Sequence, residues 1–232
     1  MDAKLPLKGV TLKVLSIDTA TELLDLCLAT PNGFYTRSSN AGLTHAQHLM
    51  SSIDSLLAEA STKIDAIDLI VCARGPGSFT GLRIGMATAK GLCFASNTPL
   101  VSVSTLDALA YRFWAYEGEV VPVIDARRER VYCAVYKRGR REGEYLDVRP
   151  EQLGSKISGD RGCLVTGVAR ATVDMVVEKI DDAIADPLTG VGAGPALLTL
   201  GIERFEKGEI ENPDSGPIYL RLSDAEEKRS AK

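Results

Sequence analysis

Residues 12–29 read LKVLSIDTATELLDLCLA, and this stretch decides how the fold is interpreted. Two apolar segments, residues 14–17 and 23–29, flank the small polar turn DTAT. Apolar runs on both sides of a short polar turn are typical of a β-hairpin. The stretch therefore predicts two antiparallel strands, with Asp18 and Thr19 in the turn between them.

A second stretch, residues 120–137, repeats this pattern as VVPVIDARRERVYCAVYK, and its Asp125 aligns with Asp18. Any two hairpins share such alternation, so the similarity by itself leaves chance open. Its position at the start of the second half favours a duplicated domain. We therefore expect two related halves, residues 1–117 and 118–222. A polar tail at residues 223–232 has little to bury.

Strands and helices are expected to alternate along the remaining chain. The expected strands are residues 67–72, 100–103 and 163–166, and residues 217–222 are expected to be extended. The expected helices are residues 43–60, 82–95, 106–116, 171–185 and 195–205. Apolar residues three and four positions apart support the first helix, and Ser104 or Thr105 can cap the third. The pattern predicts an α/β fold.

The composition is that of an ordinary folded protein. Of the 232 residues, 45% are hydrophobic and 25% are charged, and the net charge of −4 argues against unaided binding to a phosphate backbone. The five cysteines are scattered and form no C-x-x-C pair, which favours reduced thiols in a cytoplasmic protein. The sequence contains neither a secretion signal nor a continuous apolar stretch of membrane-spanning length, so we expect no membrane association.

A glycine-rich loop, residues 75–81, lies between an expected strand and an expected helix. Glycines at that place can bring backbone N–H groups close to a phosphate, or they can simply form a tight turn. The loop is not a Walker A motif, because no Lys-Ser or Lys-Thr follows its last glycine. Both readings remain open at this point.

Small residues form two stripes along the helix that follows the glycine loop. One stripe is Gly81, Gly85 and Ala89, and the other is residues 87, 91 and 95. Glycine is costly inside a helix, so the stripes indicate close neighbours on two sides. One neighbour is the chain's own sheet, and the other is a second helix or another subunit. We predict a partner interface in which Met50, Ile53 and Leu57 face Gly81, Gly85 and Ala89.

Few residues suggest catalysis. His45 and His48 are too few to hold a metal, and Ser78 lies outside a nucleophile motif, so we expect neither a catalytic nor a metal site. Asp18 with Thr19 resembles the pair that holds a metal–phosphate in actin-like ATPases, which allows weak nucleotide or phosphate binding. Glycines 190, 192 and 194 can form an adenosine loop, although a helix cap explains them better.

The basic residues gather between positions 127 and 141. A solvated hairpin tip explains this cluster, and an RNA or anion contact is the alternative. If RNA is contacted, Arg127, Arg128 and Arg130 are the residues we expect to make an auxiliary contact.

Five motifs along the chain resemble the TsaB (YeaZ) family. They are LSIDTAT, GPGSFTGLRIGMATAKGL, PLVSVSTLDALA, VIDARRERVY and PIYLR. The resemblance implies an actin/Hsp70/sugar-kinase-like (ASKHA) fold with two ribonuclease-H-like halves, and dimerisation through the first two helices. The H-x-x-x-H metal pair of the catalytic relative TsaD is matched here only by His45 and His48, one residue too close. Residues 167–169 depart from the family pattern, so nothing is carried over to that loop.

The resemblance also implies a function. It implies a non-catalytic scaffold or activator subunit for threonylcarbamoylation of adenosine 37 in tRNAs that read ANN codons. The implied partners are TsaD, TsaE in a ternary complex, and a second copy of the chain when TsaD is absent, with tRNA bound indirectly. ATP and metal are expected on TsaD and TsaE rather than on this chain. The alternatives are an autonomous small-molecule kinase or ATPase of the same fold and, more remotely, a peptidase.

Overall fold

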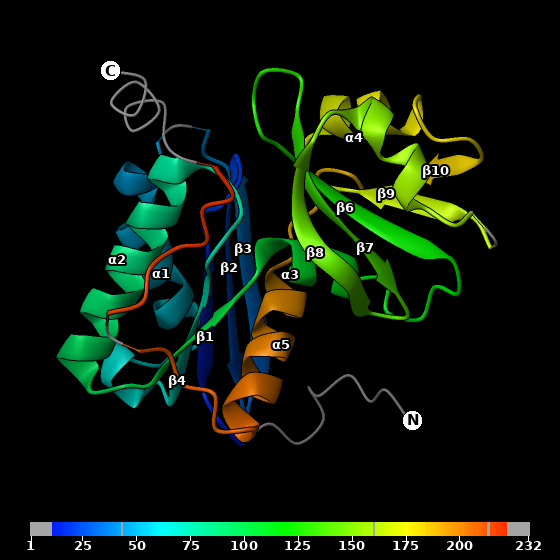
Figure 1. Cartoon of the computed structure of the whole chain (residues 1–232). Coiled ribbons are helices and arrows are strands. Elements are labelled where there is room, and N and C mark those ends of the chain that lie inside the picture. Colours follow the sequence, from blue (N-terminus) through cyan, green and yellow to red (C-terminus); the bar gives the residue numbers. More distant parts are fainter. Residues whose placement is uncertain (1–10, 43, 160, 213, 222–232) are drawn as a thin grey trace.

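Two five-stranded β-sheets with packed helices make up the protein (Figure 1). The computed structural model describes residues 11–42, 44–159, 161–212 and 214–221. The start of the chain and the expected polar tail, residues 223–232, lie outside the described residues.

The first sheet has the strand order β3-β2-β1-β4-β5. Its strands are β1 (Val14–Asp18), β2 (Leu23–Thr30), β3 (Gly33–Asn40), β4 (Leu69–Ala73) and β5 (Leu100–Val103). The predicted hairpin is confirmed, because β1 pairs antiparallel with β2 and places Asp18 opposite Asp25. The sequence pattern misses β3, because this edge strand is exposed and mostly polar, and its sequence has no apolar face.

The second sheet repeats this arrangement with the order β10-β9-β6-β7-β8. Its strands are β6 (Glu119–Asp125), β7 (Val131–Lys137), β8 (Arg140–Val148), β9 (Cys163–Thr166) and β10 (Ala183–Ala185). In each sheet the first three strands are antiparallel neighbours and the last two add in parallel. Asp125 ends β6 as Asp18 ends β1. The two sheets are therefore two copies of one α/β unit.

The main helices lie near the expected positions, and two of them end earlier than expected. They are α1 (His45–Glu59), α2 (Phe79–Ser96), α3 (Thr105–Tyr111), α4 (Arg170–Val177) and α5 (Gly194–Glu206), with 3-10 turns at Ile64–Ala66, Pro150–Gln152 and Gly154–Lys156. The helix expected over residues 171–185 ends at Val177, and its last three residues form β10 instead; the helix expected over residues 106–116 ends at Tyr111. The segment expected to be extended forms no strand over residues 217–221.

The last helix of each unit crosses to the other sheet. Helix α5 packs on strands β1, β2, β4 and β5, whereas α3 packs on β6 and β7. One apolar cluster consequently contains side chains from both units, for example Leu106, Tyr136 and Leu197. The expected boundary at residues 117 and 118 falls between α3 and β6 and stays a prediction, since α5 leaves its own unit to cover the first sheet.

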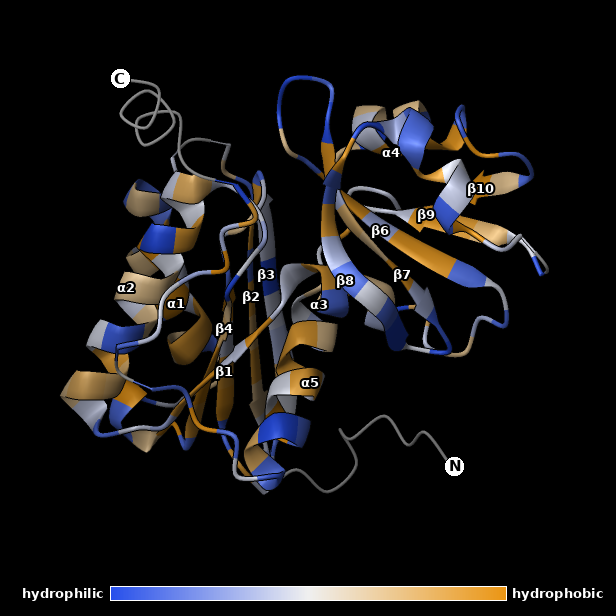
Figure 2. Ribbon diagram, in the orientation of Figure 1, coloured by the Kyte–Doolittle hydropathy of each residue, from blue (hydrophilic) through white to orange (hydrophobic). Residues whose placement is uncertain are grey.

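The opposite face of the first sheet is covered by α1 and α2 (Figure 1). Leu49, Ile53 and Leu56 of α1 are fully buried there together with Met86 of α2. Figure 2 shows the apolar strands of this sheet enclosed between helices that carry both hydrophobic and hydrophilic segments. Burying a leucine or isoleucine completely contributes about 1.5–3 kcal/mol, so this layer fixes both helices on the sheet.

Candidate functional site

A cavity of about 810 Å³ opens between the two units. Its walls come from the β1–β2 turn and the start of α1, from the glycine loop and the start of α2, from the β6–β7 hairpin, and from the C-terminal segment. The residues that line it include Thr21, His45, Gly77, Phe79, Gly81, Arg127, Tyr132, Ile218 and Tyr219. The volume lies within the range of small-molecule sites.

Asp18 and Thr19, the predicted phosphate-binding pair, do not line this cavity. Both are buried. The Thr19 hydroxyl donates a hydrogen bond of 2.8 Å to the carbonyl of Gly81, and the Asp18 carboxylate accepts one of 2.8 Å from the N–H of Ala20. The pair thus binds the chain's own backbone.

Burial changes the acidity of Asp18. It raises the pKa of this carboxyl from 3.8 to about 7, the N–H of Ala20 opposes the shift, and the nearby Asp25 carboxylate adds to it. Near neutral pH the Asp18 side chain is therefore protonated in a substantial fraction of molecules.

The glycine loop is a tight packing element. A β-carbon on Gly77 would overlap the carbonyl of Ala20, and one on Gly81 would overlap the carbonyl of Thr19. The N–H of Ser78 donates to the Ala20 carbonyl at 2.7 Å. The glycines allow the loop and the β1–β2 turn to pack with their backbones in contact. Of the two interpretations left open above, the structure therefore favours the tight turn.

The third glycine cluster begins helix α5, as the helix-cap interpretation predicts. The Asp25 carboxylate accepts a hydrogen bond of 2.6 Å from the N–H of Gly194, and a β-carbon on Gly192 would overlap this carboxylate. The Asp25 carboxyl group thus occupies the positive end of α5, where burial raises its pKa and the Gly194 N–H opposes that shift. Sequence reasoning missed Asp25, although a carboxylate in an otherwise apolar strand was a visible signal.

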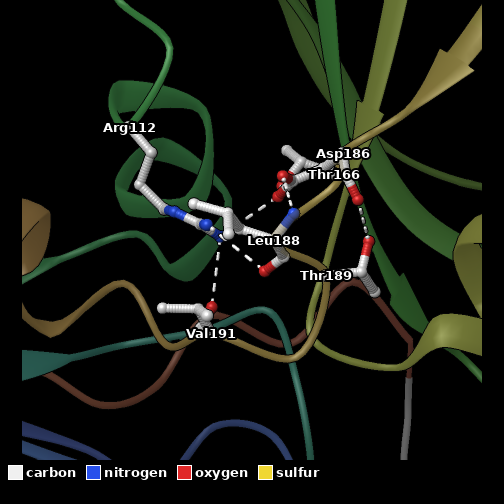
Figure 3. A network of polar contacts seen from close by, with 6 residues as sticks. All are labelled: Arg112, Thr166, Asp186, Leu188, Thr189 and Val191. Carbon is white, nitrogen blue, oxygen red and sulfur yellow. Dashed lines mark hydrogen bonds and ion pairs between the residues drawn. The ribbon is translucent and has the colours of Figure 1, made fainter.

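A buried ion pair joins the two units beside this contact (Figure 3). The Arg112 guanidinium lies 3.4 Å from the Asp186 carboxylate, which is fully buried, and donates to the carbonyl of Val191 at 3.1 Å. The hydroxyl of Thr166 and the N–H of Leu188 also donate to Asp186. Desolvation lowers the pKa of Arg112, while Asp186 and Asp25 oppose that shift. The network ties the end of α3 to the loop before α5.

The two histidines do not converge. The Nε2 of buried His45 lies 2.8 Å from the Thr21 carbonyl, and because a carbonyl only accepts, this nitrogen is the donor. His48 is exposed on the same helix. Across the described ranges, no three His, Cys, Asp or Glu side chains are grouped in a way that could hold a metal ion.

The predicted partner interface is wrong for five of its six residues. Ile53, Leu57, Gly81, Gly85 and Ala89 are buried within the chain, between the helices and the first sheet. Only Met50 of this set is on the surface, at 46% exposure. The prediction chose the wrong face of α2. The outward face carries the other stripe, Ala87, Gly91 and Ala95, and next to it Phe94 is 92% exposed.

The basic cluster is partly neutralised. Arg130 lies 2.6 Å from the Asp147 carboxylate, and Glu129 pairs with Arg149 at 3.4 Å. Arg127 stays 79% exposed beside Asp125 and lines the cavity. Of the three residues predicted to contact RNA, Arg130 is held by Asp147, Arg128 is exposed, and Arg127 lines the cavity.

The turn that carries Arg127 has an unusual backbone. Arg127, Arg128 and Glu129 have φ angles of 63°, 54° and 57°, so three successive non-glycine residues are left-handed. Each such residue costs roughly 1–2 kcal/mol. In Figure 2 the turn projects as a hydrophilic loop from the second sheet, next to the cavity-lining ends of the first unit. Retained strain of this kind is typical of functional segments.

The duplicated unit with order 3-2-1-4-5, the exchanged helices and the cavity between the units define the protein class. It is an actin/Hsp70/sugar-kinase-like α/β protein built from two ribonuclease-H-like halves. Over the described ranges, no helix has the length and apolar character needed to cross a membrane.

Comparison with known proteins assigns the family. The protein named tRNA threonylcarbamoyladenosine biosynthesis protein TsaB of Escherichia coli K12 is 30% identical over 232 residues, covering 95% of this chain and all of that protein. The protein of the same name from Bacillus subtilis is 29% identical and covers 93% of this chain and 96% of its own length. The chain belongs to the TsaB family.

Two further comparisons agree with this assignment. The structure of YeaZ from Pseudomonas aeruginosa is similar with a TM-score of 0.77 at 28% identity, covering 90% of this chain and 99% of that one. Residues 39–157 match the family described as TsaD, tRNA N6-adenosine threonylcarbamoyltransferase. The match spans the junction between the two halves.

Proposed function

We propose that this chain is a non-catalytic scaffold or activator subunit in the synthesis of threonylcarbamoyladenosine at position 37 of ANN-decoding tRNAs. Relatives named for this biosynthesis support the pathway. One observation supports the non-catalytic role: three elements that could hold phosphate are filled by the chain itself. Thr19 binds Gly81, the glycine loop packs on Ala20, and Asp25 occupies the start of α5.

The partner that this proposal requires is the transferase TsaD, with TsaE as a third subunit and a homodimer when TsaD is absent. Relatives named for threonylcarbamoyladenosine biosynthesis share this chemistry with the family described as TsaD, tRNA N6-adenosine threonylcarbamoyltransferase, which supports the pairing. ATP and metal are then held by TsaD and TsaE, the tRNA is reached through the complex, and the proposed location is the cytoplasm. Five free cysteines agree with a reducing compartment.

The partner surface in this proposal is the outward face of the first two helices. Met50 of α1 and Phe94 of α2 are large apolar side chains left exposed there. A β-carbon on Gly91 would meet no atom within 4 Å, so the stripe around it is smooth and open. Small residues beside an exposed aromatic side chain allow a partner helix to approach closely and bury the ring.

Depletion tests this function. We expect cells depleted of the protein to lose threonylcarbamoyladenosine from ANN-decoding tRNAs while they still form the threonylcarbamoyl adenylate, because the proposed subunit acts after that intermediate. Mass spectrometry of tRNA nucleosides measures the first quantity, and re-expression of the wild-type chain is the control. Unchanged modification after depletion would contradict the proposal.

A further inference from the structure

The mouth of the cavity carries an aromatic and cationic cluster built from two distant parts of the sequence. The rings of Phe79 at the start of α2 and Tyr219 near the C-terminus have centroids 4.8 Å apart. The Arg83 guanidinium lies 3.9 Å from the centroid of the Phe79 ring, and its Nε donates to the Tyr219 hydroxyl at 3.1 Å. Phe79 and Tyr219 both line the cavity.

The backbone holds Tyr219 in this place. The N–H of Ile218 donates to the Arg74 carbonyl at 2.7 Å. A β-carbon on Gly75 would come within 2.9 Å of the Ile218 carbonyl, so the glycine at this position lets the segment lie close to the loop. The Tyr219 side chain itself remains 41% exposed. The backbone of this segment is therefore held against the glycine loop, while the Tyr219 ring is accessible to a ligand.

A cation borders the same cavity from the second unit. Arg127 lines it from the left-handed turn, and Asp125 accepts a hydrogen bond of 2.8 Å from the Arg127 N–H and so fixes the start of that turn. Tyr132 of β7 contributes another ring to this wall. Aromatic rings from both units and an exposed guanidinium thus share one cavity.

This combination matches the chemistry of an unpaired nucleotide. Bases stack on aromatic side chains and on arginine planes without a demand for sequence, and a guanidinium binds the phosphate. A nucleoside triphosphate fits less well, since the inner positions for a phosphate chain are filled by Thr19, Ala20 and Asp25 as described above. The favoured ligand places its base at the mouth and needs one phosphate contact.

We propose that the cavity mouth binds an unpaired nucleotide of single-stranded RNA, with the base against Phe79 and Tyr219 and a backbone phosphate at Arg127. The choice of RNA over a free nucleotide rests on the proposed function, in which a tRNA is modified. The net charge of −4 keeps the interaction weak. One phosphate contact gives a shallow salt dependence. The logarithm of the association constant falls by about 0.7 for each tenfold rise in salt concentration.

Fluorescence anisotropy tests the site with the full-length protein and a short, fluorescein-labelled, unstructured RNA at low and moderate salt. We expect Tyr219→Ala to weaken binding roughly tenfold or more, because one stacking surface is lost. Tyr219→Phe keeps the ring and should bind like the wild type. Arg127→Ala should weaken binding and flatten its salt dependence.

Two surface variants control for general effects. Phe34→Ala removes an exposed ring of β3 that does not line the cavity, and Arg138→Ala removes a charge from the β7–β8 turn, at the other end of β7 from the Arg127 turn. Both should leave the affinity unchanged. Circular dichroism and thermal unfolding confirm that each variant is folded before its affinity is compared.

Three results would overturn the inference. They are the absence of RNA binding by the wild type, equal affinity for wild type and Tyr219→Ala, and binding of duplex RNA as strong as that of single strands. ATP binding tighter than the RNA would assign the site to a free nucleotide and would equally overturn it. The depletion experiment is independent, so failure here leaves the proposed function standing or falling on its own result.

Discussion

The hydroxyl of Thr19 occupies the space that a β-carbon on Gly85 would take. The same hydroxyl donates a hydrogen bond of 2.8 Å to the carbonyl of Gly81, one turn earlier on α2. Helix α2 therefore packs on the β1–β2 turn through its glycine stripe, with Thr19 in direct contact with the helix backbone. This stripe belongs to the interior of the chain, and the opposite stripe with Gly91 is the one that meets solvent.

A pair of glycine substitutions in α2 tests this orientation. Gly85→Ala should lower the free energy of unfolding by about 1–3 kcal/mol, because the new methyl group displaces Thr19. Gly91→Ala should raise it by up to about 1 kcal/mol, because alanine is the better helix former and the site is open. Urea unfolding of both variants measures the difference. Equal changes in the free energy of unfolding would contradict the assignment of Gly85 to the buried face of α2 and of Gly91 to the exposed face.

The acidity of Asp18 predicts a pH dependence of stability. Its pKa is raised in the folded protein from 3.8 to about 7, so the folded state binds a proton that the unfolded state has released. This contribution is fully present below about pH 4 and is lost as the pH rises through about 7. Across that window it amounts to at most on the order of 4 kcal/mol.

Asp18→Asn isolates the effect, since the amide oxygen can still accept from Ala20 while the group no longer titrates. We expect the stability of the variant relative to wild type to increase as the pH rises from 4 to 7 and to level off above. Denaturant unfolding at several pH values measures it. A constant difference between the two proteins across that range would contradict the assignment.

How much the sequence predicts depends on what each pattern encodes. The hairpin repeat at Asp18 and Asp125 predicts the duplicated units, because alternation and turn chemistry are local properties. The orientation of α2 is not local. Both of its stripes are small, and only the packing of Thr19 against Gly85 selects the inner one.

The candidate site shows the same division. The glycine loop and the Asp18 turn are visible in the sequence, but their contact with each other depends on the folded backbone. The contact of Asp25 with Gly194 joins positions 169 residues apart, and the ring contact of Tyr219 with Phe79 also joins distant parts of the sequence. Such long-range contacts leave no periodic signal. They explain why the interface predicted on the Gly85 stripe was wrong and why the cluster of Phe79 and Tyr219 was missed.

The left-handed turn predicts a stabilising substitution. Glu129 has a φ of 57° and its ion pair with Arg149 is solvent-exposed, so Glu129→Gly should raise the free energy of unfolding by about 1 kcal/mol. For a chain of this size that corresponds to about 2–4 °C in melting temperature. Glu144→Gly, at an exposed position inside β8, is the control and should be destabilising. Destabilisation by Glu129→Gly would show that the turn is not strained.

The outward face of α2 predicts a separation of folding from assembly. Phe94 is 92% exposed, so Phe94→Asp should leave the melting temperature nearly unchanged. If a partner covers this face, burying the unpaired carboxylate should weaken association at least tenfold. Co-purification with TsaD and size-exclusion chromatography measure this, with Phe34→Asp, at another exposed aromatic position on β3, as the matched control. Undiminished association of the Phe94→Asp variant would move the interface elsewhere.

Reconstituted tRNA modification tests the central claim most directly. Purified TsaD and TsaE are supplied with tRNA, ATP and the threonylcarbamoyl adenylate, with or without this chain, and nucleosides are analysed by mass spectrometry. We predict threonylcarbamoyladenosine only when the chain and TsaD are both present, and neither product nor ATP hydrolysis by the chain alone. Full activity in its absence, or turnover by the isolated chain that is lost on Asp18→Ala, would contradict the account.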